Sequence, residues 1–148
     1  MILSRSRRKM SVDANVLMAA IAYKSKVTPQ VLDRIRSRDE LIVSNIILLQ
    51  CTRQANKKNC RLDEDAIRRA VLEICPDVVM IEVLPLEELR RRYSIRDEGD
   101  LEVLYSADAT HSDILITGDK DFYDENWPPR GAKVRFMRPR EYLEEDEE

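Results

Sequence analysis

The sequence predicts an α/β fold, a three-layer α/β/α sandwich around a central parallel sheet of about five strands. Short apolar runs alternate with helical patterns along the chain, and several of these runs end in an acidic or hydroxyl residue. The chain of 148 residues is long enough for one hydrophobic core. Strands separated by helices form right-handed βαβ units, which place parallel strands in one sheet that is covered on both faces.

Five short segments are expected to form this sheet, because each is rich in apolar and β-branched residues. In chain order they are residues 10–13, 40–45, 77–84, 113–118 and 131–137. The third segment, with the sequence DVVMIEVL, is expected to be a fully buried strand.

The expected helices lie between these strands and have recognisable ends. Thr28 is expected to cap the second helix, with Pro29 at its first position, and Ser44 to cap the third. Pro76 ends the fourth helix. The helical segments are residues 14–26, 28–38, 45–58, 62–75, 85–95 and 97–111, with a short helix after 118 and a final helical turn at 139–145.

Charge divides the chain into three parts, although the net charge is only −3. Residues 1–9 carry four basic side chains, and residues 141–148 carry six acidic ones. We therefore expect a single domain at residues 10–140, a basic N-terminal extension at 1–9 and an acidic C-terminal tail at 141–148.

The sequence also argues against several classes of protein. No apolar run approaches the ~18 residues of a membrane span, and no apolar segment follows the basic start as in a secretory signal. The three cysteines, Cys51, Cys60 and Cys75, are widely spaced and form no C-x-x-C motif. We therefore expect reduced thiols, a cytoplasmic protein and no association with a membrane.

Aspartates recur where the expected strands end. Asp13 closes the first strand, and Asp119 and Asp121 follow the fourth. Asp97 and Asp100 begin the helix that leads into the fourth strand. Because the carboxyl ends of parallel strands meet at one edge of a sheet, we expect these carboxylates to converge there.

Each aspartate also has an ordinary structural interpretation. Asp97 could cap the helix that follows it, and Asp100 complements the dipole of that helix. The pair after the fourth strand could cap a short helix, and Asp13 could be a turn residue beside Asn15 as the cap of the first helix. These interpretations leave the convergence unexplained.

Neighbouring carboxylates repel one another and raise each other's pKa, which is costly unless a cation lies among them. Mg²⁺ and Mn²⁺ prefer hard oxygen ligands and often bind substrate phosphates as well. The pattern therefore predicts a divalent-metal site for phosphate chemistry, with hydrolysis of phosphodiester bonds as the reaction.

Four motifs, SVDANVL, VSNIILLQ, DEGDLEVLYSA and DILITGDKDF, resemble the PIN-domain family of metal-dependent ribonucleases. They occur in the family's order over residues 10–122. The resemblance implies a PIN-like α/β/α fold and an endonuclease that uses Mg²⁺ or Mn²⁺ and acts mainly on RNA. Because many members are toxins and many are homodimers, it also implies a toxin–antitoxin pair, an antitoxin partner and a homodimer.

The resemblance carries over to individual residues. Asp13, Asp100 and Asp119 match the family's acids and are the expected catalytic residues. Thr117 matches the hydroxyl residue beside the site, and Asn15 is expected to support it. The expected metal ligands are Asp13, Asp97, Asp100, Asp119 and Asp121.

One position departs from the family's pattern. Six residues after the serine of the second unit the family usually has a glutamate, and here that place holds Gln50. An amide can hold a metal-bound water but carries no negative charge, so we expect weaker metal affinity and slower turnover. The alternative is a catalytically weakened PIN-like protein that binds RNA.

An acidic pocket needs basic residues to hold the phosphates of RNA. The candidates are Lys120 between the two acids, and Arg53 and Lys57 after Gln50. Each could instead belong to an ordinary solvated face.

Two other classes of function stay open. A phosphoacceptor receiver domain also has acids at strand ends, but it places a pair of acids after the first strand and an aspartate after the third. Here Asp13 stands alone, and the third segment contains Glu82 but no aspartate near its end. A pure interaction module, in which the acids are caps, should gain no thermal stability from Mn²⁺.

Overall fold

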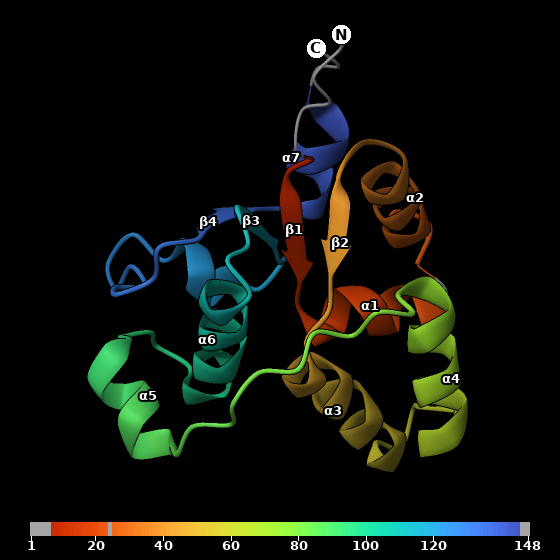
Figure 1. Ribbon diagram of the computed structural model, residues 1–148, viewed down its shortest axis with the longest axis horizontal. Coiled ribbons are helices and arrows are strands. Elements are labelled where there is room, and N and C mark those ends of the chain that lie inside the picture. The colour runs from red at the N-terminus through yellow and green to blue at the C-terminus, as the bar shows by residue number, and fades with distance from the viewer. Residues whose placement is uncertain (1–6, 24, 146–148) are drawn as a thin grey trace, which may run out of the picture.

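The computed structural model describes residues 7–23 and 25–145 of the chain. Four parallel strands form one sheet in the order β2-β1-β3-β4 (Figure 1). The strands are β1 (Lys9–Val12), β2 (Glu40–Ile42), β3 (Ile114–Ile116) and β4 (Arg135–Met137). Every residue of β3 is buried, because β3 lies between two strands and under the flanking helices. The predicted α/β fold with a central parallel sheet is confirmed.

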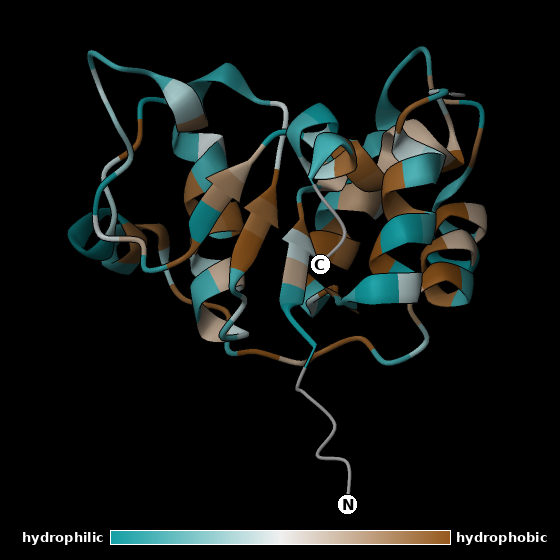
Figure 2. Cartoon of the chain, turned by 90° about the horizontal axis from the view of Figure 1, so that it is seen from above, coloured by the Kyte–Doolittle hydropathy of each residue, from teal (hydrophilic) through white to brown (hydrophobic). Residues whose placement is uncertain are grey.

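Helices flank this sheet and alternate with its strands along most of the chain. They are α1 (Ala14–Ile21), α2 (Thr28–Arg38), α3 (Asn45–Arg53), α4 (Glu64–Ile74), α5 (Leu86–Arg92), α6 (Leu101–Ala109) and α7 (Pro139–Glu144), with 3-10 helices η1 (Gln54–Asn56), η2 (Glu98–Asp100) and η3 (Lys120–Tyr123). Figure 1 shows α1, α3 and α4 beyond the carboxyl ends of β1 and β2, while α5 and α6 lie side by side. The helices carry both apolar and polar residues (Figure 2), as expected of helices with one buried face.

The starts of the helices follow from local hydrogen bonding. Ser44 caps α3 as predicted, and its hydroxyl accepts a backbone N–H three residues further on at 3.2 Å. Thr28, in contrast, is not the N-cap of α2 but its first residue, with Pro29 second. The Oγ of Ser25 accepts the N–H groups of Val27 and Thr28, both at 3.2 Å, and so satisfies two backbone donors where the helix begins.

The prediction of a fully buried strand at residues 77–84 is wrong. Only Val79 forms a bridge to the chain just beyond β2, with its N–H bonded at 2.9 Å and its carbonyl accepting the N–H of Asn45 at 3.0 Å. Met80 is 76% exposed and Val83 is 65% exposed. Because the chain turns into α3 at Asn45, no neighbouring strand continues beside this segment. An apolar run alone does not specify burial.

Most of the predicted helices are shorter than expected, three of them markedly. The helix expected at 14–26 ends at Ile21, and the one expected at 45–58 ends at Arg53 and continues as η1. The helix expected at 97–111 begins as the 3-10 helix η2 before α6. Helix ends depend on tertiary contacts, which sequence periodicity does not report.

A cluster of polar side chains joins the beginning and the end of the described chain. Asp39, which is 5% exposed, accepts two hydrogen bonds from Arg8 at 3.1 Å and one from the hydroxyl of Tyr142 at 2.7 Å. Glu145 pairs with the same guanidinium. Burial opposes ionisation of Asp39, but these hydrogen bonds hold its pKa below the ordinary value.

The predicted terminal extensions are only partly within the described chain. Residues 1–6 of the basic extension and residues 146–148 of the acidic tail lie outside the described residues. Among the described helices, none is both long and apolar enough to cross a bilayer.

Substitution of Tyr142 by Phe tests the cluster around Asp39. The variant loses a hydrogen bond to a charged group, so we expect its free energy of unfolding near pH 7 to fall by about 2 kcal/mol. Because the folded-state pKa of Asp39 is depressed, its contribution is present above its unfolded pKa of about 4 and is lost as the pH falls through its folded pKa. Urea unfolding at several pH values should show the difference shrinking in acid, and an equal loss at all pH values would contradict this account.

Candidate metal and active site

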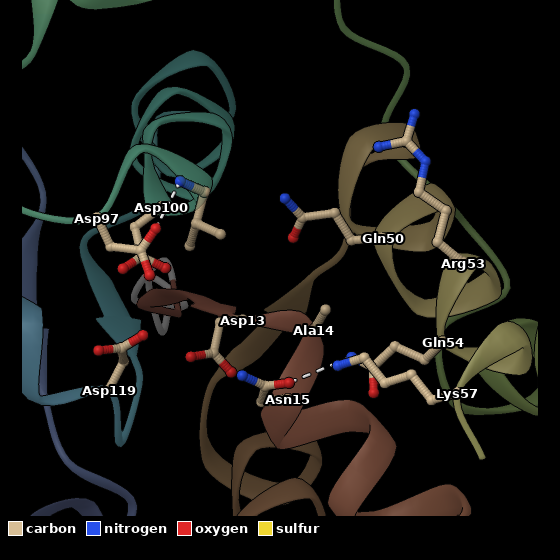
Figure 3. A pocket seen from close by; sticks show the side chains of 12 residues that line it. Asp13, Ala14, Asn15, Gln50, Arg53, Gln54, Lys57, Asp97, Asp100 and Asp119 are labelled. Atoms are coloured by element: carbon tan, nitrogen blue, oxygen red, sulfur yellow. Dashed lines mark hydrogen bonds between the residues drawn. The ribbon is translucent and has the colours of Figure 1, made fainter. Parts of the chain in front are cut away.

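The candidate site lies where the order of the strands reverses. The chain leaves β1 for β2 on one side and later places β3 on the other side, so a crevice opens beyond the carboxyl ends of β1 and β3. A pocket of about 300 Å³ lies there (Figure 3). It is lined by Asp13, Ala14, Asn15, Gln50, Arg53, Gln54, Lys57, Asp97, Gly99, Asp100, Val103 and Asp119.

Asp13 lies at the end of β1 and is held by both of its oxygens. Its Oδ1 accepts the N–H of Val16 at 2.8 Å, so that Asp13, rather than Asn15, is the N-cap of α1. Its Oδ2 accepts a hydrogen bond from the buried hydroxyl of Thr117. Burial raises the pKa of Asp13, and the bond from Thr117 opposes that rise. Asn15 is exposed and accepts a bond from the amide of Gln54 at 3.2 Å.

Thr117 also connects Asp13 to the acids that follow β3. Its Oγ1 accepts the N–H of Asp119 at 3.2 Å, and the carboxylate of Asp119 accepts the N–H of Asp121 at 2.9 Å. The hydroxyl of Tyr123 donates to the carbonyl of Thr117 at 2.7 Å. The loop after β3 is therefore fixed by its own polar groups, and it places Asp119 at the edge of the pocket.

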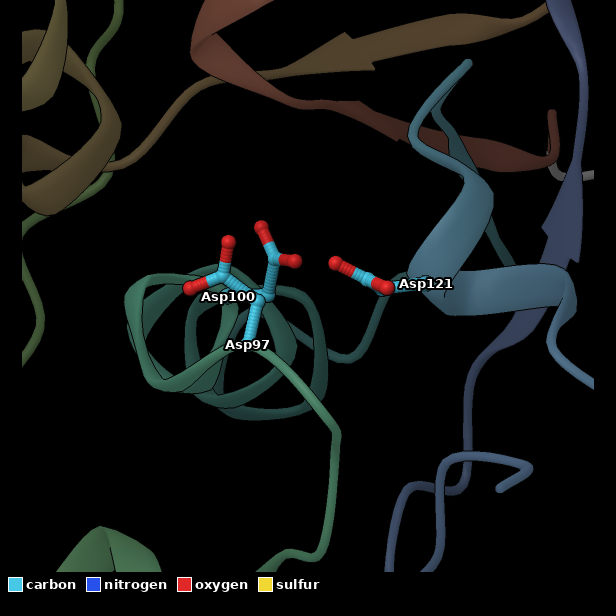
Figure 4. A group of neighbouring side chains, drawn as sticks. All are labelled: Asp97, Asp100 and Asp121. Carbon is cyan, nitrogen blue, oxygen red and sulfur yellow. The ribbon is translucent and has the colours of Figure 1, made fainter. Parts of the chain in front are cut away.

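Asp97 and Asp100 bring two further carboxylates from the start of α6. Asp97 caps η2, since its Oδ1 accepts the N–H of Gly99 at 2.8 Å, whereas Asp100 makes no capping bond. One oxygen each of Asp97, Asp100 and Asp121 lies within 4.8 Å of the other two (Figure 4). This acidic triad could bind a metal ion.

Asp100 is the acid that capping does not explain. Its Oδ2 is buried and has no hydrogen-bond partner among the described residues. Burial, followed by the negative charges of Asp119 and Asp97, raises the pKa of Asp100 to about 8. A buried carboxylate oxygen without a donor is costly, and a cation would compensate it. A donor set made only of carboxylate oxygens fits a hard divalent cation.

The opposite wall of the pocket comes from α3 and the turn after it. In Figure 3 the amide of Gln50 points across the pocket toward the acids. Gln50 is half-buried, and its side-chain amide forms no hydrogen bond with any residue that the structure describes. Arg53 and Lys57 are exposed and line the same side. An anionic ligand in this pocket would therefore meet carboxylates on one wall and two cations on the other.

Not every predicted residue lies at the pocket. Lys120, the first residue of η3, is exposed and does not line it. Asp121 belongs to the acidic triad without lining the pocket itself. Sequence reasoning missed Gln54, which bonds to Asn15, and Tyr123, which bonds to Thr117. Both contacts exist only in the folded chain. Gly99 was also missed, although a glycine two residues after an aspartate is a recognisable turn signal.

Comparison with known proteins identifies the family. The PIN domain model matches residues 10–126, which is most of the chain. The chain therefore belongs to the PIN domain family. The family match favours a PIN domain over the alternative of a phosphoacceptor receiver domain, and the segment 77–84, expected as the third strand, is not one of the four strands of the described chain. No curated protein matches the sequence significantly.

Two solved structures share the fold. VapBC2 from Rickettsia felis, bound to a DNA fragment from their promoter, has a TM-score of 0.59 and 14% identity, covering 88% of this chain and 98% of that one. PAE2754 from Pyrobaculum aerophilum has a TM-score of 0.53 and 18% identity, covering 90% of each chain. At such low identities the similarity shows the shared fold alone.

Substitution of Asp100 by Asn should stabilise the metal-free protein in a pH-dependent way. The folded pKa of about 8 lies above the unfolded value of about 4, so the folded state binds more protons between these values and loses stability as the pH rises. The neutral amide removes this loss, and we expect a Tm higher by a few degrees near pH 8 and little change near pH 5. Thermal unfolding in a chelator measures both.

The exposed acid Asp65 of α4 provides the matched control. Its replacement by Asn makes the same chemical change away from the pocket and should lower the Tm only slightly, and equally at both pH values, because it removes one exposed ion pair. A lower Tm of the Asp100 variant near pH 8 would refute the account of its carboxylate.

Proposed function

We propose that this protein is a divalent-metal-dependent ribonuclease that hydrolyses RNA phosphodiester bonds. The observation that supports this most strongly is the buried, unpartnered oxygen of Asp100 among four other carboxylates in a PIN domain. In this proposal Asp13, Asp100 and Asp119 are the catalytic residues, and Asp97 and Asp121 complete the ligand set for Mg²⁺ or Mn²⁺.

The protein's own residues have distinct roles in the proposed reaction. When bound, the cation supplies positive charge that neutralises the scissile phosphate and activates the attacking water. Thr117 fixes the orientation of Asp13, so this carboxylate needs no rearrangement before the reaction. One carboxylate accepts the proton of the attacking water. Arg53 and Lys57, on the opposite wall, bind phosphate oxygens and position the strand.

Gln50 is the residue on which the choice between an active ribonuclease and a catalytically weakened RNA-binding protein depends. Its neutral amide faces the acids, so the site has one negative charge fewer than a glutamate would give. Weaker metal binding and slower turnover follow from that loss. The second candidate function, which Gln50 favours, is a PIN-like protein that binds RNA with weakened catalysis.

We also propose that the protein is the toxin of a toxin–antitoxin pair, that it forms a homodimer and that it acts in the cytoplasm. The similarity of its fold to VapBC2 of Rickettsia felis supports the first part. An antitoxin would then be its protein partner and RNA its substrate.

Cleavage of a mixed panel of RNAs in Mn²⁺ or Mg²⁺ tests the proposed function. Asp119→Asn should lower the cleavage rate by about 100-fold or more, since residues that merely support metal ligands already cost 10- to 100-fold when mutated. Asp65→Asn serves as the control and should cleave like the wild type. Metal-dependent cuts that persist unchanged in the Asp119 variant would exclude this site as their origin.

A thermal titration with Mn²⁺ separates the metal site from acids that act only as caps. A cation that binds only the folded state raises the Tm by mass action. The wild type should gain stability with Mn²⁺, and Asp100→Asn should gain less. If Mn²⁺ does not raise the Tm of the wild type, the aspartates act only as helix caps and the metal site is refuted.

Substitution of Gln50 by Glu should restore the missing charge. We expect half-maximal activity at a lower Mn²⁺ concentration and a cleavage rate several-fold higher, because the added carboxylate attracts the cation. Gln30→Glu, on the exposed face of α2, makes the same charge change far from the pocket and is the control. An unchanged or lower rate in the Gln50 variant would count against the role assigned to this position.

A further inference from the structure

Trp127 is the only tryptophan of the chain, and it is 53% exposed. It is nevertheless held firmly in place. Its backbone N–H donates to Asp124 at 3.1 Å, and its indole Nε1–H donates to the hydroxyl of Ser94 at 3.3 Å. The indole therefore has its polar group satisfied while more than half of its surface stays in contact with solvent.

A second hollow, of about 270 Å³, surrounds this indole and is lined by Ser94, Asn126, Trp127, Pro128 and Arg130. The backbone of Arg130 is paired with that of Ser94 at 2.8 and 3.0 Å. Its guanidinium, in contrast, is engaged by no residue within the described ranges 7–23 and 25–145. An aromatic ring and an unengaged cation thus border the same hollow. Proteins that bind single-stranded nucleic acid use this combination, because bases stack on aromatic rings and cations contact the backbone.

A series of contacts connects this hollow to the acidic triad. Two segments, 94–97 and 121–130, run beside one another away from the acids. Asp97 and Asp121 meet in the triad (Figure 4), Arg96 pairs with Asp124 at 3.3 Å, and Ser94 then bonds to Trp127.

The hollow and the acids are close enough for one strand of RNA to reach both. Three residues of chain span at most about 11 Å, so Ser94 lies no further than that from Asp97. Even at the rise of a duplex strand, about 3.4 Å per nucleotide, about three nucleotides bridge this distance.

We propose that this hollow holds an unpaired base of the substrate, stacked on Trp127, with a neighbouring phosphate against Arg130. The inference rests on the proposed ribonuclease function and adds a base-binding subsite at Trp127, outside the acidic pocket. A base inside a duplex is already stacked on its neighbours and cannot occupy the hollow.

The surroundings of Trp127 favour RNA over a protein partner. The other residues of the hollow are mostly polar, whereas the exposed apolar residues Met80, Val83 and Leu86 belong to a different part of the chain, on and beside the segment 77–84. An apolar protein surface would find little to cover around the indole.

Binding in a chelator tests this inference separately from catalysis. The single tryptophan reports directly on the hollow, so its fluorescence should be quenched when the full-length protein is titrated with a single-stranded RNA oligonucleotide. A duplex of the same sequence should quench it less. Trp127→Ala should weaken single-strand binding, followed by anisotropy of a labelled RNA, by about 10-fold or more, and Trp127→Phe should retain most of the affinity.

Two further variants test whether a loss of RNA affinity is specific to the hollow around Trp127. Arg130→Ala should lower the salt dependence of binding by about one phosphate contact. Met80→Ala, an exposed apolar residue elsewhere, should bind like the wild type. Urea unfolding confirms that each variant is folded before its affinity is compared.

The outcomes separate this inference from the proposed function. With Mn²⁺, Trp127→Ala should raise KM about as much as it weakens binding and leave kcat nearly unchanged. If the wild type cleaves RNA and Trp127→Ala keeps its KM, the base-binding role is refuted while the ribonuclease stands. Loss of a protein partner from Trp127→Ala with unchanged RNA affinity would assign the surface to protein binding instead. If the wild type neither binds nor cleaves RNA, both proposals fail.

Discussion

Repulsion among carboxylates at the carboxyl edge of the sheet is the constraint around which this protein is arranged. Three of the acids reduce the cost by serving as caps: Asp13 for α1, Asp97 for η2 and Asp119 for η3. Their negative charge is partly compensated by backbone N–H groups. Asp100 has no such compensation, and burial together with the charges of Asp119 and Asp97 raises its pKa to about 8. The candidate metal site therefore lies where a buried carboxylate oxygen receives no hydrogen bond from the described residues.

The opposite edge of the sheet shows how the same chain treats an acid that has only a structural task. Asp39 precedes β2 and is as buried as Asp13, yet Arg8 and Tyr142 supply donors to its oxygens. Its pKa is held below the ordinary value, while that of Asp100 is raised. The buried acid at the amino edge of the sheet is thus supplied with hydrogen-bond donors, whereas Asp100 at the carboxyl edge is left for a cation to compensate.

Sequence reasoning reached the features that depend on local pattern and strand polarity. The acids at the ends of β1 and β3 were predictable because parallel strands point the same way, and Ser44 because its capping signal is local. The segment 77–84 was mispredicted because composition cannot tell whether a neighbouring strand continues beside it. The unpartnered oxygen of Asp100 and the bond between Gln54 and Asn15 depend on contacts between distant segments, so no single sequence displays them.

Several of these aspartates both cap a helix and carry charge at the candidate site, and this limits which positions can change without loss of structure. Replacing Asp13 would free the first turn of α1 as well as remove a charge, and the loop after β3 depends on Asp119 in the same way. The side chain of Gln50 has no comparable structural role, because its amide forms no hydrogen bond with the described residues. A change in catalytic activity during evolution therefore costs the least stability at position 50. A single exchange between amide and acid there alters the charge of the site and leaves the surrounding structure intact.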